Sequence, residues 1–449
     1  GINSFLYDLF LLVALFSLYP EARPVSTVRW LLAGHLICLA MVLLQNTVLS
    51  MIAFSVTFLL LVAYVEFVHR SVWYASGSIL LNVLLAVPSF FETVQPAKQW
   101  VNHRIPWRKW IRFSIIPIIL SLIFYFLYSN SNSLFASFAQ NLVNKIADFF
   151  THFLEFFSWG RIGFFIVGLF LTTVFLLRNK LNYFVTLEKN KTDELKRKRI
   201  TNRIRETSGF TTIVKELLGK FATGMMALKN IGNVGLISLV LLNVLLLVVN
   251  TIDISYIWFG YKFGDKVNLT SMIHEGTGIL IASIVLAIIV LLVVFEGNLN
   301  FYRKSKYLKW GAYCWIAQNF MLVISVLLRD YYYIHESGLA YKRISVLFYL
   351  ALVMVGLVTV FWKIYKKKTN YYLFRVNAWA VIVLLVFSTA VDWDEWIASY
   401  NTSHNKNILL PVDFMVNLSN KALIVLDKER DVLKGQQQLL LSQGVNWPY

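Results

Sequence analysis

The chain has 449 residues, of which 58% are hydrophobic, 16% aromatic and only 15% charged. Soluble domains average about 45–50% apolar and about 25% charged residues, so this composition excludes an ordinary soluble protein. The formal net charge of +18 would point to nucleic acid in a soluble chain, but here the basic residues gather in segments between apolar runs. We therefore expect membrane lipids, and no nucleic acid, as partners.

Apolar runs of roughly the length that carries a helix across about 30 Å of hydrocarbon recur along the chain. They predict an all-α fold, a polytopic α-helical membrane protein with about eleven transmembrane helices. The predicted spans are residues 5–19, 30–44, 50–68, 72–91, 113–128, 162–177, 231–249, 278–295, 311–328, 346–362 and 371–390. No basic residues precede the first run, so no cleavable signal peptide is expected, and we expect the native chain to begin upstream of Gly1.

Residues 134–157 show a different pattern. Apolar side chains recur at helical spacing, and Asn141, Asp148 and Glu155 recur on the opposite face. This spacing predicts an amphipathic helix. Such a helix either lies in the membrane interface or packs against the bundle, and the pattern leaves both arrangements open.

The basic loop at residues 178–229 holds thirteen Lys and Arg residues against five Asp and Glu residues. The positive-inside rule places such a loop in the cytoplasm. With eleven spans, the inner segments are then 93–112, 178–229, 296–309 and 363–375, which together hold 27 of the 42 Lys and Arg residues. This threading predicts a bacterial inner-membrane protein with a cytoplasmic N-terminus and a periplasmic C-terminus.

The same threading divides the chain into five parts. They are residues 1–128 (N-terminal transmembrane helices), 129–177 (amphipathic helix and sixth span), 178–230 (basic cytoplasmic loop), 231–390 (C-terminal bundle) and 391–449 (periplasmic helical tail). The predicted outer segments are residues 20–29, 68–71, 129–161, 251–277, 329–345 and 391–449.

Polar side chains gather at the predicted outer ends of the second half, which we call the outer mouth. The candidate binding residues there are Asp253, His274, Glu275, Arg329, Asp330, Arg343, Asp392 and Asn401. They lie far apart in the sequence but at one predicted depth, so they meet if the last five spans form a bundle.

Three interpretations of the outer mouth stay open. His274, Glu275, His335 and Glu336 carry imidazole and carboxylate groups that suit zinc, but they lack the helical HExxH spacing. Carboxylates buried at the interface would suit acid–base chemistry. The favoured interpretation is that these charges cap helices and form ion pairs. No catalytic residue, metal or cofactor is therefore predicted.

Ionisable residues deep inside the predicted spans are scarce, with only Asp8 and His35 in that position. This scarcity argues against ion-coupled transport, which uses several such residues. Cys38 and Cys314 both lie in apolar spans, and we expect them to be small core residues without a disulfide. No phosphate-binding glycine loop or nucleophile elbow occurs in the sequence.

The second half resembles an uncharacterised bacterial integral-membrane family, the domain-of-unknown-function 4153/4173 group. The matching segments are residues 241–258 (LLNVLLLVVNTIDISYIW), 264–276, 315–346, 391–401 (VDWDEWIASYN) and 412–426. Ala340 stands where this family usually has Thr, and His274 where it often has Tyr. The resemblance implies the membrane spans and the outer tail, and it implies no catalytic residue.

The leading functional hypothesis is a non-catalytic membrane component that presents its outer mouth and tail to an envelope partner, which is either another protein or a lipid-linked glycan. This hypothesis expects the tail to be ordered against Arg329 and Arg343 by four of its residues, namely Asp392, Trp393, Tyr400 and Asn401. The alternative is a membrane enzyme or transporter that acts on a lipid or lipid-linked precursor, which requires a cavity opening near His274 and Asp330. A third option is a sensor that signals through residues 178–229.

Overall fold

The computed structural model describes residues 2–93, 159–178, 181–196, 227–259, 280–292, 305–404 and 412–430, together with isolated residues between these ranges. The described residues form helices and an isolated β-bridge between Glu194 and Lys368. Seven of the described helices are long and apolar enough to cross a membrane, and three shorter apolar helices accompany them. The prediction of an all-α polytopic membrane protein is confirmed.

The first half forms one bundle of helices. Its members are α1 (Ile2–Leu18), α2 (Ser26–Leu44), α3 (Val48–Phe67), α4 (Val72–Thr93) and α7 (Trp159–Leu176). Helix α3 begins where the Thr47 side chain accepts a hydrogen bond from the Ser50 amide, and it ends at Val68, which adopts the left-handed conformation. Leu15, Leu61 and Tyr64 are fully buried in this bundle.

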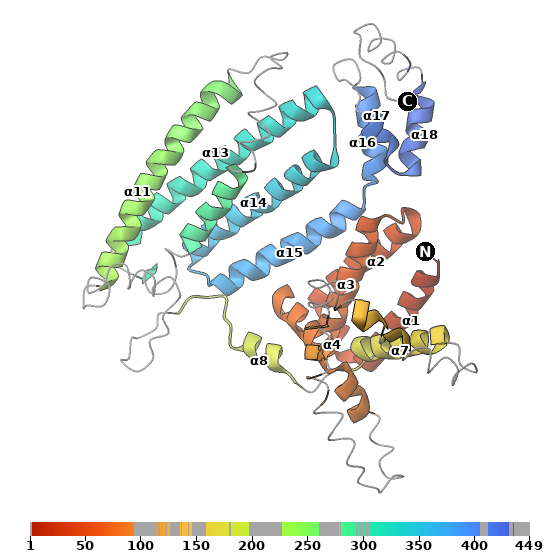
Figure 1. Cartoon of the computed structure of the whole chain (residues 1–449). Helices are drawn as coiled ribbons and strands as arrows, with labels where there is room; N and C mark the ends of the chain where they lie inside the picture. Colours follow the sequence, from red (N-terminus) through yellow and green to blue (C-terminus); the bar gives the residue numbers. More distant parts are fainter. Residues whose placement is uncertain are drawn as a thin grey trace.

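The second half forms a row of neighbouring helices. They are α11 (Ala227–Asp253), which continues as a π-helical turn (Ile254–Trp258), then Leu280–Leu292, α13 (Ser305–Ser337), α14 (Tyr341–Lys366) and α15 (Asn370–Thr389). Figure 1 shows α11, α13, α14 and α15 side by side, coloured from green to blue. Leu239, Leu322, Leu350 and Leu357 are buried between them. Helix α13 has 33 residues, about 50 Å of helix, so its ends extend beyond the hydrocarbon.

Helix α15 joins the two halves. The Trp379 ring meets the Tyr64 ring edge to face at 5.4 Å. Near the C-terminal end of α15, a Cβ atom at Gly34 of α2 would lie 3.5 Å from a Val386 methyl group. The short tail helices α16 (Trp393–Ser403), α17 (Val412–Val416) and α18 (Asn420–Lys428) follow α15, at the top of Figure 1.

The sequence placed the short turns of the first half and the basic loop on opposite faces of the membrane, and this relative placement is wrong. The Tyr19 hydroxyl donates to the Leu176 carbonyl at 3.1 Å and accepts from the Arg178 amide at 3.0 Å. The Arg70 guanidinium donates to the carbonyl of Lys191 at 2.9 Å. Residues 19 and 68–71 therefore lie at the same end of the protein as residues 178–196, although the sequence placed 20–29 and 68–71 on the opposite membrane face.

The physical reason is that each of these turns carries too few charges to orient its own hairpin. Their sides were assigned by counting spans back from the basic loop, so an error in the count inverts every helix before it. The fifth predicted span, residues 113–128, and the amphipathic helix, residues 134–157, lie largely outside the described residues. The prediction counted one crossing in that interval, and the orientation of α1 to α4 relative to the basic loop depended on that count.

Two predictions about single residues also need correction. Cys314 is exposed on α13, whereas Cys38 is buried as expected. Glu66, near the end of α3, is 1% exposed and joins Asp8 and His35 as a buried ionisable residue. Glu66 lies two residues from the end of the predicted span 50–68 and was not counted among the deep residues.

Candidate functional site

The outer mouth contains a buried ion pair that ties α11 to α13. Arg329 Nη2 lies 2.5 Å from Asp253 Oδ1, and both side chains are at least nine-tenths buried. Asp330 is also buried beside Arg329. The structure therefore brings Asp253 and Arg329 together, as expected for ion pairs at helix ends.

The tail is attached to the turn between α13 and α14 through Asn401. Its Oδ1 accepts a hydrogen bond from the Leu339 amide at 2.6 Å, and its Nδ2 donates to the Leu339 carbonyl at 3.0 Å. Gly338 precedes this residue with a φ of 79°, a conformation that glycine adopts readily. The side chain of Asn401 is thus a two-point clasp on the backbone of the turn.

Other contacts close the tail into a small folded unit. Asp392 caps α16 at the Glu395 amide and accepts from Lys421 Nζ at 2.8 Å. Asp394 accepts from the Tyr341 hydroxyl and from the Ser419 amide. The buried apolar residues of this unit include Leu339, Ile344, Ile397, Met415 and Leu426.

Arg329 and Arg343 do not order the tail, which corrects the sequence prediction. Arg329 is engaged by Asp253. Arg343 donates to the carbonyls of Ser337 and Gly338 and lies over the Tyr333 ring at 4.0 Å. The tail is held instead by the backbone of Leu339, by the Tyr341 hydroxyl and by apolar packing, which a sequence pattern based on charges cannot identify.

The other candidate residues at this end, His274 and Glu275, lie outside the described residues. Among the described residues, no group of three or more His, Cys, Asp or Glu side chains could hold a metal ion. Four buried atoms at the outer mouth make no hydrogen bond within the described structure: Asp253 Oδ2, Arg329 Nε, Asp330 Oδ2 and Arg343 Nε. Such atoms are the points where a ligand or water can add hydrogen bonds.

A second polar cluster, which the sequence did not reveal, lies at the opposite end of the protein. It is centred on Glu188 of α8 (Tyr183–Lys189), which is 4% exposed. Four groups donate to its carboxylate: His69 Nδ1 at 2.8 Å, the Ser71 amide at 2.8 Å, the Tyr371 hydroxyl at 2.7 Å and the Arg70 amide at 3.2 Å. Glu188 thus fastens the basic loop to both halves of the protein.

The hydrogen bonds keep this carboxylate charged. Burial by itself raises the pKa of Glu188, but the bonds from His69, Tyr371 and the Arg70 amide outweigh burial, so the pKa lies below its ordinary value. Residues 69 and 188 are 119 positions apart. No spacing rule connects them, and a lone glutamate in a basic loop gives no signal of burial.

Helix α8 also approaches α4 closely at Gly77. A Cβ atom there would lie 2.8–3.0 Å from three carbons of the Phe184 ring. The absence of a side chain at this position lets α8 pack over the start of α4.

Gly77→Ala is therefore expected to destabilise the protein by about 1–3 kcal/mol through overpacking. The measurement is thermal unfolding in detergent. Gly163→Ala on α7, where a Cβ atom meets nothing within 4 Å, is the matched control and should be neutral or slightly stabilising. Equal behaviour of the two variants would contradict close packing of α8 on α4.

The two predicted deep residues, Asp8 and His35, contact each other. His35 Nε2 lies 3.1 Å from Asp8 Oδ2, and His35 Nδ1 lies 3.0 Å from Thr57 Oγ1. Nearer the end of α3, Asn82 Nδ2 donates to Glu66 Oε2 at 2.6 Å. These contacts are interhelical hydrogen bonds of the kind that occur in membranes, although Glu66 Oε1 is buried without a hydrogen bond within the described residues.

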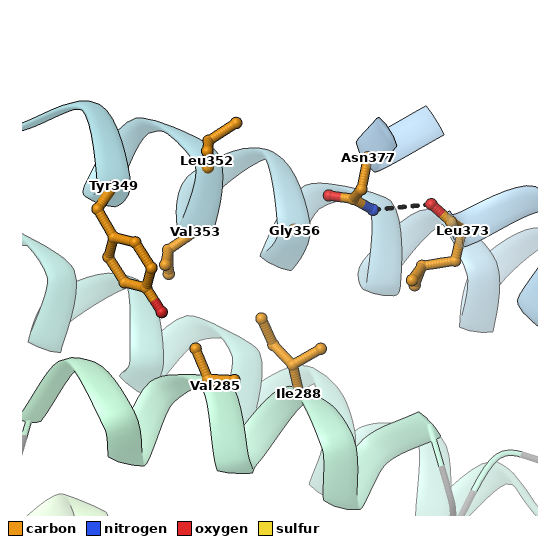
Figure 2. A pocket seen from close by; sticks show the side chains of 8 residues that line it. All are labelled: Val285, Ile288, Tyr349, Leu352, Val353, Gly356, Leu373 and Asn377. Atoms are coloured by element: carbon orange, nitrogen blue, oxygen red, sulfur yellow. Dashed lines mark hydrogen bonds between the residues drawn. The ribbon is translucent and has the colours of Figure 1, made fainter. Parts of the chain in front are cut away.

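A cavity of about 190 Å³ lies between Leu280–Leu292, α14 and α15. Its lining is nearly all apolar and consists of Val285, Ile288, Tyr349, Leu352, Val353, Gly356, Leu373 and Asn377. Figure 2 shows that the Asn377 amide is turned to the Leu373 carbonyl, to which it donates at 2.9 Å. None of the candidate outer-mouth residues lines this cavity.

No curated protein and no solved structure matches the chain. A family profile described as Domain of unknown function (DUF4153) matches residues 9–429, which is far more than half of the chain. The all-α membrane architecture and this match agree with the resemblance seen in the sequence, and the chain belongs to the DUF4153 family.

Proposed function

We propose that this protein is a component of the bacterial inner membrane that presents a folded tail to a protein partner in the cell envelope. The observation that carries the proposal is the Asn401 clasp on Leu339. A tail with no role beyond ending the chain would not need a buried side chain fitted to the backbone of another helix turn.

The proposal includes a revised threading. The thirteen Lys and Arg residues of 178–229 favour the cytoplasm for that loop. Residues 19 and 68–71 contact the loop, so they share its side, and α1 then begins on the outer face. In this threading the start of α1 and the tail both face the periplasm, and an even number of crossings separates residue 67 from residue 227.

The partner is a protein with an apolar contact surface. The tail exposes large apolar side chains, with Trp396 50% exposed and Ile424 59% exposed. Outside the hydrocarbon, exposed apolar side chains on a folded unit favour a protein interface. Aromatic anchors such as Trp396 are enriched at the centres of such interfaces.

Photo-crosslinking in living cells tests the proposal. A photoreactive amino acid at position 396 or 424 should give a discrete protein adduct, and Asn401→Ala should abolish it. The same amino acid at the exposed α11 position 241 is the control and should give lipid adducts only. Lipid adducts alone from positions 396 and 424 would count against an envelope partner.

Asn401→Ala is expected to loosen the tail because it leaves the buried Leu339 amide and carbonyl without partners, at about 1–3 kcal/mol for each group. Limited proteolysis of the purified protein should then cleave the tail faster. Ser403→Ala, an exposed position two residues on, should leave the cleavage rate unchanged. An unchanged rate in Asn401→Ala would mean that the clasp does not hold the tail.

The alternative proposal is a protein that handles a lipid or lipid-linked precursor. The apolar cavity in Figure 2 favours it, because methylene groups suit such a lining. The cavity lies among the spans, however, and not at Asp330. Gly356→Phe would fill it, and loss of co-purified lipid in that variant would favour this alternative over the tail-presenting role.

A further inference from the structure

Three buried side chains in the Glu188 cluster form a continuous relay. Ser78 Oγ lies 2.7 Å from His69 Nε2, and His69 Nδ1 lies 2.8 Å from Glu188 Oε2. The exposed fractions of Ser78, His69 and Glu188 are 4%, 3% and 4%. A hydroxyl, an imidazole and a carboxylate in this order and at these distances are the arrangement that activates a serine nucleophile.

The hydrogen bonds fix the direction of the relay. The Glu188 carboxylate is an ionised acceptor, since its pKa is lowered even though burial alone raises it. His69 therefore donates from Nδ1, and in the tautomer that carries its proton there, Nε2 is the acceptor for the Ser78 hydroxyl. The Ser71 amide and the Tyr371 hydroxyl hold the carboxylate in place.

Ser78 also differs from other buried hydroxyls in the helices of this protein. Thr57, Thr173 and Thr359 each donate to a carbonyl three or four residues back in their own helix. Such back-bonding is the ordinary state of a helical hydroxyl. The hydrogen bond described for Ser78 Oγ instead joins it to His69, which comes from outside α4.

The position of the relay indicates the chemical class of substrate. Ser78 is the seventh residue of α4, so it lies about 9 Å along the helix from Val72. His69 and Glu188 lie outside the membrane-spanning helices, at the end where the basic loop contacts the bundle. The ester carbonyls of membrane lipids lie at a similarly shallow depth, and the exposed Arg70 is a nearby cation for a phosphate group.

We propose that Ser78 is the nucleophile of an acyl-transfer site, with His69 as general base and Glu188 as positioning residue, that acts on an acyl ester of a membrane lipid. Ser78 Oγ bonds to the ester carbonyl carbon while its proton passes to His69 Nε2. The carbon–oxygen ester bond then breaks, and His69 returns the proton to the departing alkoxide. Water repeats the sequence on the acyl-serine and releases the fatty acid, so no oxidant or reductant is needed.

The experiment treats the full-length protein, in its native membrane and in detergent, with an alkyl fluorophosphonate, which forms a stable bond to activated serines. The expected result is a single labelled site, mapped by mass spectrometry to Ser78 and absent in Ser78→Ala. A long-chain probe should label faster than a short-chain probe. Thr57→Val, which alters the other hydroxyl–histidine–carboxylate group of the bundle, is the matched control and should keep full labelling.

Two further variants separate reactivity from folding. His69→Gln should slow labelling by about 100-fold or more. Ser78→Cys, made with Cys38 and Cys314 replaced by serine, should react with iodoacetamide at a lower pH than a free cysteine does, because His69 accepts its proton.

Glu188→Gln should shift the pH at which labelling begins, which a purely structural contact would not do. A folded wild-type protein without label at Ser78, together with ordinary reactivity of the Ser78→Cys thiol, would overturn the proposal and leave the cluster as a structural clamp. Tail crosslinking at Trp396 is independent of this outcome.

Discussion

Glu188→Ala is expected to lower the free energy of unfolding by about 3–5 kcal/mol, because each buried donor left without an acceptor costs about 1–3 kcal/mol. The variant leaves the His69 imidazole, the Ser71 amide and the Tyr371 hydroxyl without their shared acceptor. Because these donors come from both halves of the protein, α8 should detach at the same time. The measurement is unfolding by SDS in mixed micelles, with proteolysis of residues 178–196 as a second readout.

Glu194→Ala is the control for this variant. Glu194 lies in the same loop and pairs with Lys368, but its side chain is 76% exposed. Exposed pairs contribute about 0–1 kcal/mol, so this variant should behave like the wild type. Comparable losses in both variants would mean that the burial of Glu188 has no energetic consequence.

The effect of Glu188→Ala should also depend on pH. The pKa of Glu188 is lower in the folded protein than its ordinary value, so its contribution is fully present above the unfolded value of about 4.3. The contribution disappears as the pH falls through the lower folded pKa. The difference between wild type and variant should therefore be largest near neutral pH and shrink in acid.

The helices themselves could be predicted from the sequence, because a segment inside the hydrocarbon must be apolar and must satisfy its backbone hydrogen bonds within itself. The predicted span 50–68 corresponds to α3 at Val48–Phe67, and 371–390 corresponds to α15 at Asn370–Thr389. Helix α13 was underestimated, since its polar ends extend past the apolar window of residues 311–328. Hydropathy reports the hydrocarbon thickness and not the length of the helix.

The sides of the membrane could not be predicted equally well. Charge counting works for a loop such as 178–229, with thirteen basic residues, but not for a turn such as 68–71 with Arg70 as its single Lys or Arg residue. The membrane side of such a turn is inferred from the sides of the neighbouring segments, so one wrongly counted span also inverts the side assigned to the turn. Contacts between distant residues, such as Arg70 with Lys191, correct it.

The candidate site was predicted in part for a related reason. Opposite charges at the same predicted depth suggested that Asp253 and Arg329 could meet, and they do. Asn401 was expected to order the tail, but its partner is the backbone of Leu339. Because every residue has the same backbone groups, the sequence does not show which of them Asn401 binds. Ser78, His69 and Glu188 were missed because a relay assembled from a helix, a turn and a loop leaves no spacing to recognise.

A double-mutant cycle on Asp253 and Arg329 is expected to show strong coupling at the outer mouth. Asp253→Leu or Arg329→Met alone leaves a buried charge without its partner and should cost about 3–5 kcal/mol. The double variant replaces the pair by apolar side chains and should recover most of that loss, because two desolvated charges are then absent. Unfolding in mixed micelles gives the four free energies of the cycle.

The matched control is the pair Arg430–Asp427, which has the same 2.5 Å separation but side chains that are 70% and 62% exposed. Its cycle should give only about 0.2–0.5 kcal/mol, because water screens the two charges. With distance held constant, the contrast between the two cycles isolates the effect of burial. Additive losses at Asp253 and Arg329 would mean that this ion pair does not hold α11 to α13. The outer mouth beneath the tail would then be stabilised by apolar packing alone.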